Sequence, residues 1–308
     1  MRLGVLDVGS NTVHLLVVDA HRGAHPWPAR SLKERLRLAE QLGGAGELTV
    51  AGADALVKAC AQAKAAAEEL GAEELMAFAT SAVRDATNSA QVLRRVYEET
   101  GVDLKVLSGE DEARMTFLAV RRWFGWSAGR LMVLDIGGGS LELAAGIDES
   151  PTVAVSLPLG AGRLTRRWLA ADPPGAAELA ALESYVDEQL MHRELDELRG
   201  CEFAAATSKT FRSLARLAGA APSGDGLWAP RALTRRGLHQ VRGFIQRIPS
   251  AALAELDGVS ASRAHQLLAG AVVAEAAMRR LGVDELRICP WALREGVILT
   301  RLDQLTTG

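Results

Sequence analysis

The residue types best suited to chemistry begin near the start of the chain, in the stretch LDVGSNTVHLL. Asp7 ends an apolar run, and Gly9, Ser10 and Asn11 follow it before a second apolar run begins. A glycine has no Cβ, so its backbone can approach a ligand closely and can adopt a positive φ. Convergent backbone N–H groups and hydroxyls bind anions. The stretch therefore predicts a turn that binds phosphate oxygens.

The same pattern returns in the stretch VLDIGGGSLEL, where Asp135 stands 128 positions after Asp7 (135 − 7). Three consecutive glycines and a serine follow this aspartate: Gly137, Gly138, Gly139 and Ser140. Neither stretch is a P-loop or a dinucleotide-binding motif, because GxxxxGK[ST] is absent and no GxGxxG opens a helix after a strand. Two matched copies favour a phosphate site over a plain hairpin turn.

Three carboxylates accompany these turns. Asp7 and Asp135 end the strands before the turns, and Glu142 follows Ser140 by two positions. Negative charge around phosphates requires a cation, and Mg²⁺ (or Mn²⁺ in its place) takes carboxylate and phosphate oxygens. We therefore expect Asp7, Asp135 and Glu142 to be metal ligands, with an outward-facing strand position as the alternative for Glu142.

A third stretch, VLSGEDEARMTF, combines a capping pattern with a candidate base. Ser108 has the position of a helix N-cap, and Glu110, Asp111 and Glu112 follow it in the first helical turn. Acidic residues there complement the helix dipole without any catalytic role. One of the three carboxylates could instead act as general base on an attacking water.

The elements around these motifs repeat along the chain. Each aspartate–glycine stretch reads as a β-hairpin, because β-type apolar runs flank a short turn. In the first half, strands are expected at 28–38, 75–80 and 104–107, and helices at 53–70, 89–100 and 110–124. In the second half, strands are expected at 131–135, 141–146, 152–157, 202–206 and 285–289, and helices at 176–199, 209–217, 234–247 and 262–281.

This order predicts an α/β protein with two domains of similar topology around a phosphate-binding cleft. The stretch GWSAG, residues 125–129, is the expected boundary, because glycines there end a helical pattern. We expect domains at 1–125 and 126–308, with the C-terminal helix as a candidate addition to the first.

Composition narrows the classes of function. The chain has 308 residues, 48% hydrophobic and 24% charged, and a formal net charge of −3, which gives no general attraction for nucleic acid. Arginine pairs such as Arg121-Arg122 are interpreted as solvated helix faces. Three widely spaced cysteines and the absence of a long apolar run indicate a cytoplasmic protein without a membrane segment.

Six stretches together resemble the exopolyphosphatase/guanosine pentaphosphate phosphatase (Ppx/GppA) family. They are LDVGSNTVHLLVVD, AFATSAVRDATN, VLSGEDEARMTFLAV, LDIGGGSLELAAG, SLPLGAGRLT and ICPWALREGVIL, and they follow the family order along almost the whole chain. The resemblance is closest to the short actinobacterial-type members. It implies two actin-like (ribonuclease H-like) domains.

The resemblance also implies roles for individual residues. It implies that Glu112 is the catalytic base and that Arg84, from the SAVRDA motif, contacts phosphate. The family's first phosphate motif falls on Asp7 and the turn that follows it. The second falls on Asp135, the glycine turn and Glu142. The implied reaction is Mg²⁺-dependent hydrolysis of the terminal phosphoanhydride of inorganic polyphosphate, releasing orthophosphate.

The remaining features of the sequence allow more than one interpretation. Where many relatives have a glycine-rich loop, this chain has AATSKTF, so Lys209 could supply a positive charge or simply begin a helix. The chain carries no counterpart of a longer relative's C-terminal extension, which favours short polyphosphate chains as substrates. A pppGpp 5′-phosphohydrolase and a non-catalytic polyphosphate or nucleotide sensor are the alternatives. A homodimer is expected from the resemblance only.

Overall fold

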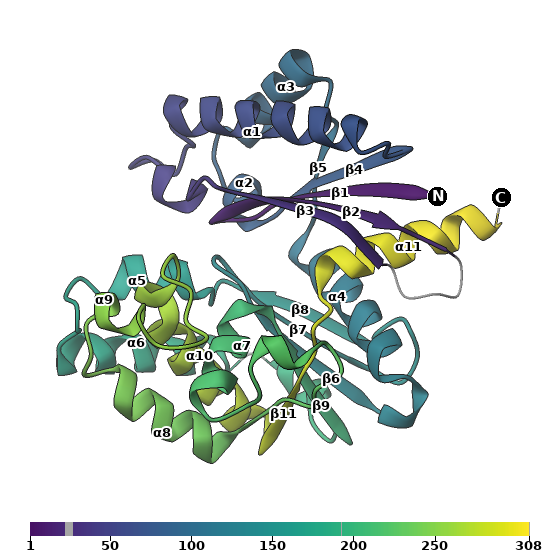
Figure 1. Ribbon diagram of the computed structural model, residues 1–308. Helices are drawn as coiled ribbons and strands as arrows, with labels where there is room; N and C mark the ends of the chain where they lie inside the picture. Colours follow the sequence, from purple (N-terminus) through teal and green to yellow (C-terminus); the bar gives the residue numbers. More distant parts are fainter. Residues whose placement is uncertain (22–26, 192, 308) are drawn as a thin grey trace. The chain divides into compact units, whose positions relative to one another are not determined.

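The computed structural model describes residues 1–21, 27–191 and 193–307. Packing divides the chain into two compact units. Unit 1 comprises Met1–Met115 and Leu293–Gly308, and unit 2 comprises Thr116–Ala292. Each unit contains one β-sheet with helices packed against it, and the two are described separately below (Figure 1).

Unit 1 is built on a five-stranded sheet with the order β3-β2-β1-β4-β5. β1 pairs antiparallel with β2 and parallel with β4, so three meander strands continue into a parallel half. The strands are β1 (Arg2–Val8), β2 (Thr12–Asp19), β3 (Trp27–Arg35), β4 (Glu74–Ala79) and β5 (Leu104–Val106). The helices are η1 (Leu38–Gln41), α1 (Val50–Glu69), α2 (Ser81–Arg84), α3 (Ser89–Thr100), the start of α4 (Gly109–Phe124) and α11 (Leu293–Thr307).

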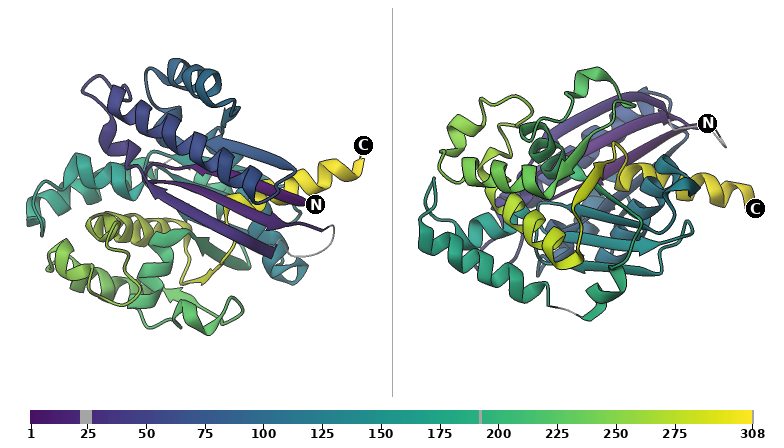
Figure 2. Two further views of the ribbon diagram at one scale, coloured as in Figure 1. Left: turned by 45° about the horizontal axis from the view of Figure 1, so that its top comes forward. Right: turned by 90° about the horizontal axis from the view of Figure 1, so that it is seen from below.

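Helices cover both faces of this sheet. α1 and α3 lie over one face, where Leu56 and Val96 pack with Leu6 and Leu15 of the hairpin (Figure 1). α11 lies on the other face, where Ile298 packs against the alternate strand residues (Figure 2). Two-sided burial explains why β1 and β2 read as almost continuous apolar runs.

The approach of α11 to α4 depends on a missing side chain. A Cβ on Gly296 would lie 2.0 Å from the carbonyl oxygen of Met115, a distance that no real Cβ contact allows. The glycine in the sequence ALREGVIL therefore lets the C-terminal helix pack directly on the first half of α4. This contact ties residues nearly two hundred positions apart into one unit.

Unit 2 repeats the topology of unit 1 with one added strand. Its sheet has the order β10-β11-β9-β6-β7-β8, in which β6 pairs antiparallel with β7 and parallel with β9. The strands are β6 (Leu131–Ile136), β7 (Leu141–Gly146), β8 (Val153–Leu157), β9 (Phe203–Thr207), β10 (Ala232–Thr234) and β11 (Glu285–Ile288). The helical segments are the rest of α4, η2 (Trp126–Ala128), α5 (Ala161–Trp168), α6 (Ala176–Gln189), η3 (Arg193–Leu198), α7 (Ser208–Leu217), η4 (Ser223–Asp225), α8 (Arg235–Ile245), α9 (Ser250–Leu253), η5 (Ala264–Gln266) and α10 (Leu267–Leu281).

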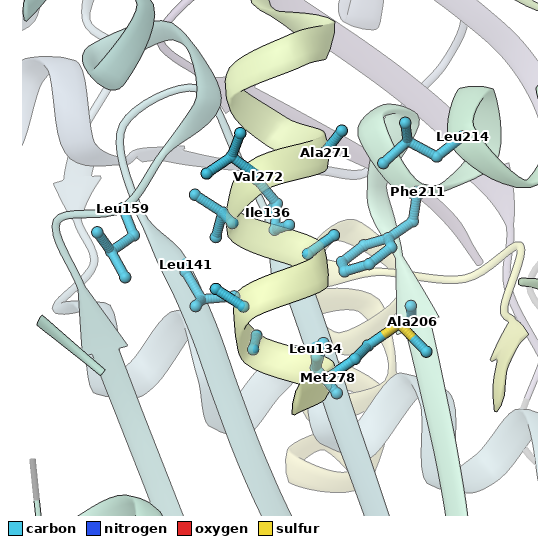
Figure 3. Close-up of a cluster of buried hydrophobic side chains, with 14 of the residues drawn as sticks. Leu134, Ile136, Leu141, Leu159, Ala206, Phe211, Leu214, Ala271, Val272 and Met278 are labelled. Carbon is cyan, nitrogen blue, oxygen red and sulfur yellow. The ribbon is translucent and has the colours of Figure 1, made fainter. Parts of the chain in front are cut away.

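The core of unit 2 forms where α10 crosses the sheet. Figure 3 shows Val272 and Met278 of α10 facing Leu134, Ile136 and Leu141 of the hairpin strands, with Phe211 of α7 beside them. Phe211 and Ile136 are fully buried. Because α7 and α10 are both fixed on this core, the segments at the ends of β6 and β9 have rigid supports.

Two predicted helices are wrong in extent. The helix expected at 176–199 ends at Gln189, where Arg280 of α10 donates a hydrogen bond of 3.0 Å to the carbonyl of Leu190, and the 3₁₀ segment η3 follows. The helix expected at 262–281 begins as α10 at Leu267 after the short η5. The sequence reading also missed α5, which supports the glycine turn of unit 2.

The units do not divide at the expected glycine stretch. The division falls after Met115, inside the continuous helix α4, and the chain returns to unit 1 at Leu293. The stretch 125–129 instead forms η2 within unit 2. Loop composition marks where a helix ends, whereas the packing of α11 and the start of α4 decides where the unit ends. Within the described part of the chain, no helix combines the length and apolar composition needed to span a bilayer.

Candidate functional site

The aspartate–glycine turn of unit 1 is a tight β-hairpin connection between β1 and β2. The N–H of Gly9 donates to the carbonyl of Thr12 over 3.0 Å, which closes the turn. The carbonyls of Ser10 and Asn11 accept hydrogen bonds of 3.0–3.2 Å from backbone N–H groups of residues 36–39, which follow β3. The turn is thus anchored through its carbonyl oxygens, an arrangement that suits anion binding by its amides.

The glycine turn of unit 2 is held in the same way. The N–H of Gly137 donates to the carbonyl of Ser140 over 2.9 Å. The carbonyls of Gly137, Gly138 and Gly139 accept bonds of 2.8–3.0 Å from Ala161 and Arg163 at the start of α5. No acceptor for the N–H groups of Gly138 and Gly139 is found among the described residues. The helix fixes the turn and leaves amide donors for a ligand.

A positive φ is not what places glycines in these turns. None of Gly9 and residues 137–139 has a φ in the left-handed region, so that part of the expectation is wrong. The tightest approach involves Gly160, where a Cβ would lie 2.2–2.4 Å from backbone atoms of Gly139 and Ser140. Gly160, from the SLPLGAGRLT stretch, therefore lets α5 reach the turn.

The two carboxylates of unit 2 are direct neighbours. Asp135 and Glu142 are cross-strand partners in the β6–β7 ladder, so their side chains share one face of the sheet. Glu142 is 6% exposed and accepts a hydrogen bond of 3.0 Å from the Ser156 hydroxyl. Glu142 is therefore not an outward, solvated strand residue, and the alternative considered for it is wrong.

The equivalent position in unit 1 has a different character. Asp7 is the cross-strand partner of His14, and Arg294 of α11 lies 3.6 Å from its carboxylate. Arg294 also donates to Nδ1 of His14, so Nε2 of that ring carries the proton and donates to the Ser31 hydroxyl over 2.7 Å. Asp7 thus lies in a cationic environment, whereas Asp135 lies beside a second carboxylate.

The three acidic residues at the start of α4 have separate roles. Asp111 and Ser108 form the cap, since the Ser108 hydroxyl accepts from the Asp111 N–H and donates to its carboxylate. Glu110 is exposed and pairs with Arg114 one turn further along. Glu112 alone is buried, with 7% of its surface exposed. Helix capping explains two of the acidic residues and leaves Glu112 for another role.

Glu112 forms an ion pair with Arg84, the other residue to which the family resemblance assigns a role. Arg84 donates to the Glu112 carboxylate, to the carbonyl of Leu107 over 3.2 Å and to Asp85 over 3.2 Å. Burial alone would lower the pKa of Arg84, but the charges and hydrogen bonds of Glu112 and Asp85 raise it above its ordinary value. Arg84 therefore stays charged and fixes the orientation of the Glu112 carboxylate.

The functional elements of unit 1 meet at one edge of its sheet. The turn follows β1, α2 follows β4, and α4 follows β5, and these three strands are parallel neighbours. The hydroxyls of Ser10 and Ser81 lie 2.9 Å apart and are both buried, which joins the turn to α2. The carboxyl ends of parallel strands are the usual place for a ligand in such sheets.

The segment after β9 places Lys209 beside the second hairpin. Thr207 is the register partner of Asp135, and the Thr210 hydroxyl donates to the carbonyl of Ile136 over 3.2 Å. Ser208 has a φ of 84°, a left-handed conformation that glycine adopts more readily. Lys209 is exposed in the first turn of α7. This loop therefore holds a strained backbone directly before Lys209.

The acidic groups suit a hard cation in unit 2. Among the residues that the structure describes, no group of three or more His, Cys, Asp or Glu side chains forms a metal cluster. Asp135 and Glu142 nevertheless place two carboxylates opposite each other, where like charges are unfavourable without a cation. Carboxylates leave room for phosphate oxygens and waters in the shell of Mg²⁺.

The sequence reading missed four residues that shape the site: Ser81, Ser156, Gly160 and Arg163. Ser81 and Gly160 lie in the stretches AFATSAVRDATN and SLPLGAGRLT, which carried the family resemblance without being given a role. Their contacts with the turns join segments far apart in the chain. Neither periodicity nor local spacing indicates which segment of the chain will touch a turn.

Each unit can therefore perform part of the chemistry of phosphate esters and anhydrides. Unit 1 offers an anchored turn and a buried carboxylate that is oriented by an arginine. Unit 2 offers amide donors and a pair of carboxylates. These are the groups needed to bind a phosphoryl group, neutralise its charge and activate water.

Comparisons with known proteins agree with this chemistry. A family model described as the Ppx/GppA phosphatase family matches residues 17–305. Exopolyphosphatase 1 of Mycobacterium tuberculosis is 59% identical over 310 residues, which cover 100% of this chain and 90% of that protein. Exopolyphosphatase 1 of Mycobacterium leprae is also 59% identical, with 100% and 91% covered.

Solved structures share the fold. The Ppx/GppA enzyme of Aquifex aeolicus has a TM-score of 0.79 and 25% identity, covering 97% of this chain and 99% of its own. An exopolyphosphatase of Cytophaga hutchinsonii has a TM-score of 0.88 and 23% identity, covering 99% and 98%. The predicted fold class, α/β with two actin-like (ribonuclease H-like) domains, is confirmed.

Proposed function

Because the chain belongs to the Ppx/GppA phosphatase family, we propose that it is an exopolyphosphatase. It hydrolyses the terminal phosphoanhydride of inorganic polyphosphate and releases orthophosphate. Two mycobacterial relatives named exopolyphosphatase, each 59% identical over the whole chain, support this activity. The buried Glu112 and the two anchored turns support hydrolysis over mere binding.

Phosphate binding falls to the turns and to a few cations. We assign the binding of phosphoryl oxygens to the amides of Ser10 and Asn11 in unit 1 and of residues 138–140 in unit 2, because the N–H groups of Gly9 and Gly137 close the turns. Their carbonyls are already held by neighbouring segments, so these donors need no rearrangement when the ligand binds. Arg84 and Lys209 add positive charge. Short polyphosphate chains are the proposed substrates, because these groups suffice to bind a few phosphates at the end of a chain.

Magnesium completes the proposed site. In unit 2, Asp135 and Glu142 would hold the ion, and Mn²⁺ could replace Mg²⁺. In unit 1, Asp7 stays a proposed metal ligand, with Arg294 beside it. The fit rests on the cross-strand pair of carboxylates in unit 2 and on the oxygen ligands that Mg²⁺ prefers. When bound, the ion neutralises charge on the transferred phosphoryl group.

Glu112 accepts the proton of the attacking water. The carboxylate is buried, so it lies away from bulk solvent, and its hydrogen bond with Arg84 holds it in one orientation. A general base of this kind contributes about 10²–10⁴ in rate. Arg84 has a second role, since its guanidinium can donate to phosphate oxygens while it orients the base.

One observation carries the proposal. Of the three acidic residues in the first turn of α4, Glu110 and Asp111 are exposed and have local helical partners, and only Glu112 is buried against the arginine of the SAVRDA motif. Capping and the helix dipole account for Glu110 and Asp111, but not for the burial of Glu112 beside Arg84.

The experiment is a colorimetric phosphate-release assay with the purified protein. The substrates are polyphosphates of several lengths, pppGpp and ATP, each with Mg²⁺, with Mn²⁺ or with EDTA. We expect rapid release from polyphosphate, dependence on a divalent cation and little release from ATP. Release of phosphate from pppGpp but not from polyphosphate would replace the proposed activity with that of a pppGpp 5′-phosphohydrolase. Binding of polyphosphate without release would indicate a sensor.

A further inference from the structure

Unit 2 carries a second basic cavity that the catalytic roles above do not use. It has a volume of about 400 Å³ and lies between α7, the loop of residues 220–227 and the segment 257–258. Three arginines line it, Arg212, Arg216 and Arg231, against a single acidic residue, Asp257. We call this cavity the arginine pocket. The chain as a whole carries a net charge of −3, so its overall composition does not account for the local excess of positive charge in this pocket.

Arg231 is fixed without losing its charge. Its guanidinium donates to the carbonyls of Ala221, Pro222, Gly226 and Ala229, over 2.5–3.1 Å. These four acceptors are neutral, so they hold the side chain and the loop in place while leaving the positive charge uncompensated. The four bonds occupy four of the five N–H donors of the guanidinium, so Arg231 offers a phosphate its charge and one N–H, with little loss of side-chain entropy.

Arg212 and Arg216 extend the basic surface along α7. Arg212 donates to the carbonyl of Ser208 over 3.1 Å. Arg216 donates to the carbonyl of Ala220 and pairs over 2.6 Å with Asp257, whose side chain is 80% exposed. An exposed ion pair contributes little and is readily exchanged for a phosphate. Gly258 allows this arrangement, because a Cβ there would lie 2.3 Å from the Arg216 side chain.

A larger cavity in the same unit gives a useful contrast. It has a volume of about 630 Å³ and is lined by Arg235, Arg236 and Arg279. Here Arg235 pairs with Asp284 over 2.7 Å and Arg279 pairs with Asp187 over 2.5 Å. Two further carboxylates, Glu275 and Glu285, also line it. Its charges are therefore balanced, and it lacks the cationic excess of the arginine pocket.

The arginine pocket is connected to the glycine turn through α7. The start of α7 is fixed beside the end of β6, since Thr210 donates to the carbonyl of Ile136, the residue before the glycines. Lys209, Arg212 and Arg216 then follow at spacings of three and four residues, which place them on one side of the helix. The rise from Lys209 to Arg216 is about 10 Å. A strip of cations thus runs from the turn to the pocket.

We propose that the arginine pocket binds internal phosphates of the polyphosphate chain, behind the terminal phosphate that is hydrolysed. This inference rests on the proposed function and adds a substrate subsite to it. Polyphosphate is a flexible polyanion with charge on every phosphate, so it can follow a cationic strip that a compact nucleotide would not fill. A chain too short to reach the pocket loses this binding energy. Affinity therefore rises with chain length until the pocket is occupied and then levels off.

The test compares two substrates and two variants in the full-length protein. Tripolyphosphate has only two anhydride linkages and does not span the strip, whereas a medium-length polyphosphate does. The test variant is the double substitution R212Q/R216Q, and the control is R236Q, which removes an exposed arginine from the larger cavity. Initial rates of phosphate release give KM and kcat for each protein with each substrate, and thermal melting verifies the fold.

We expect R212Q/R216Q to raise KM for the medium-length chain about tenfold or more, with kcat nearly unchanged, because each lost charged contact weakens binding. KM for tripolyphosphate should stay within about twofold in the same variant, and R236Q should match the wild type with both substrates. An unchanged KM for the longer chain, or an equal rise for both substrates, would overturn the subsite. If the wild type releases no phosphate from either substrate, the proposed function fails instead.

Discussion

Replacing Glu112 by glutamine is the most informative perturbation of the proposed chemistry. The substituted side chain would have the same shape and would keep an oxygen that accepts from Arg84, but it cannot take a proton from water. We expect kcat for phosphate release from polyphosphate to fall about 10²–10⁴-fold, which corresponds to about 3–5.5 kcal/mol of transition-state stabilisation.

The cost to the fold can be estimated from the contacts of Arg84. In the variant Arg84 keeps its bonds to the Leu107 carbonyl and to Asp85, each at 3.2 Å, and it loses only the charge of its strongest partner. Weakening one charged hydrogen bond costs about 1–2 kcal/mol, so E112Q should melt a few degrees lower and remain folded. Loss of activity can then be separated from loss of structure.

The assay measures phosphate release at saturating substrate, together with circular dichroism melting of the same preparations. E110Q is the matched control, because Glu110 lies in the same helical turn but is exposed and pairs only with Arg114. We expect E110Q to keep near-wild-type kcat, since surface pairs contribute at most about 1 kcal/mol. The reasoning is refuted if folded E112Q retains more than about a tenth of the wild-type kcat, or if E110Q loses as much activity as E112Q.

Three further outcomes are expected. G160A places a Cβ against the backbone of the glycine turn, so it should lower the free energy of unfolding by about 1–3 kcal/mol and raise KM for polyphosphate. G243A, in open space on α8, should do neither, and equal effects of the two variants would contradict this. S208G relieves a φ of 84° and should raise the urea midpoint, with a net gain of about 0.5–1 kcal/mol after the added freedom of glycine in the unfolded chain; a lower midpoint would contradict it. Burial favours a raised pKa for Glu275, but hydrogen bonds from Arg242 and His239 and their charges hold its pKa below the ordinary value. A lowered folded pKa gives stability that is present at neutral pH and lost as pH falls, so urea unfolding should show E275Q less stable than wild type at pH 7, with the gap narrowing below about pH 4; a gap independent of pH would contradict this.

Much of the fold can be read from the sequence because its signals are local. The hairpins around Asp7 and Asp135 show as apolar runs that flank short turns, and their repetition predicts two units of one topology. The helix at residues 89–100 was predicted to the residue, since Gly101 adopts the left-handed conformation that ends a helix.

The failures of prediction arise where distant segments decide the outcome. Arg121 was expected on a solvated helix face, but it is 1% exposed and donates to the carbonyls of Gly125, Gly129 and Gly146. Burial lowers its pKa below the ordinary value. These carbonyls follow Arg121 by 4, 8 and 25 residues, and the spacing of the arginine pair gives no sign that the chain folds back to place them around its guanidinium.

The site shows the same division between local and distant information. Spacing alone identified the turns and their aspartates, but it could not choose among the three acidic residues of α4. That choice depends on Arg84, 28 residues earlier, at the end of the helix α2 that follows β4, the neighbour of β5. The support of the glycine turn by α5 likewise depends on Gly160, whose need for a missing Cβ becomes visible only when the backbones meet.

The most direct measurement follows the hydrolysis of tetrapolyphosphate in oxygen-18-labelled water by phosphorus NMR and mass spectrometry. Attack of water on the terminal phosphorus predicts orthophosphate and tripolyphosphate as the first products, with the label in orthophosphate. Pyrophosphate as the first product, label in tripolyphosphate, or no hydrolysis at all would contradict the proposed activity.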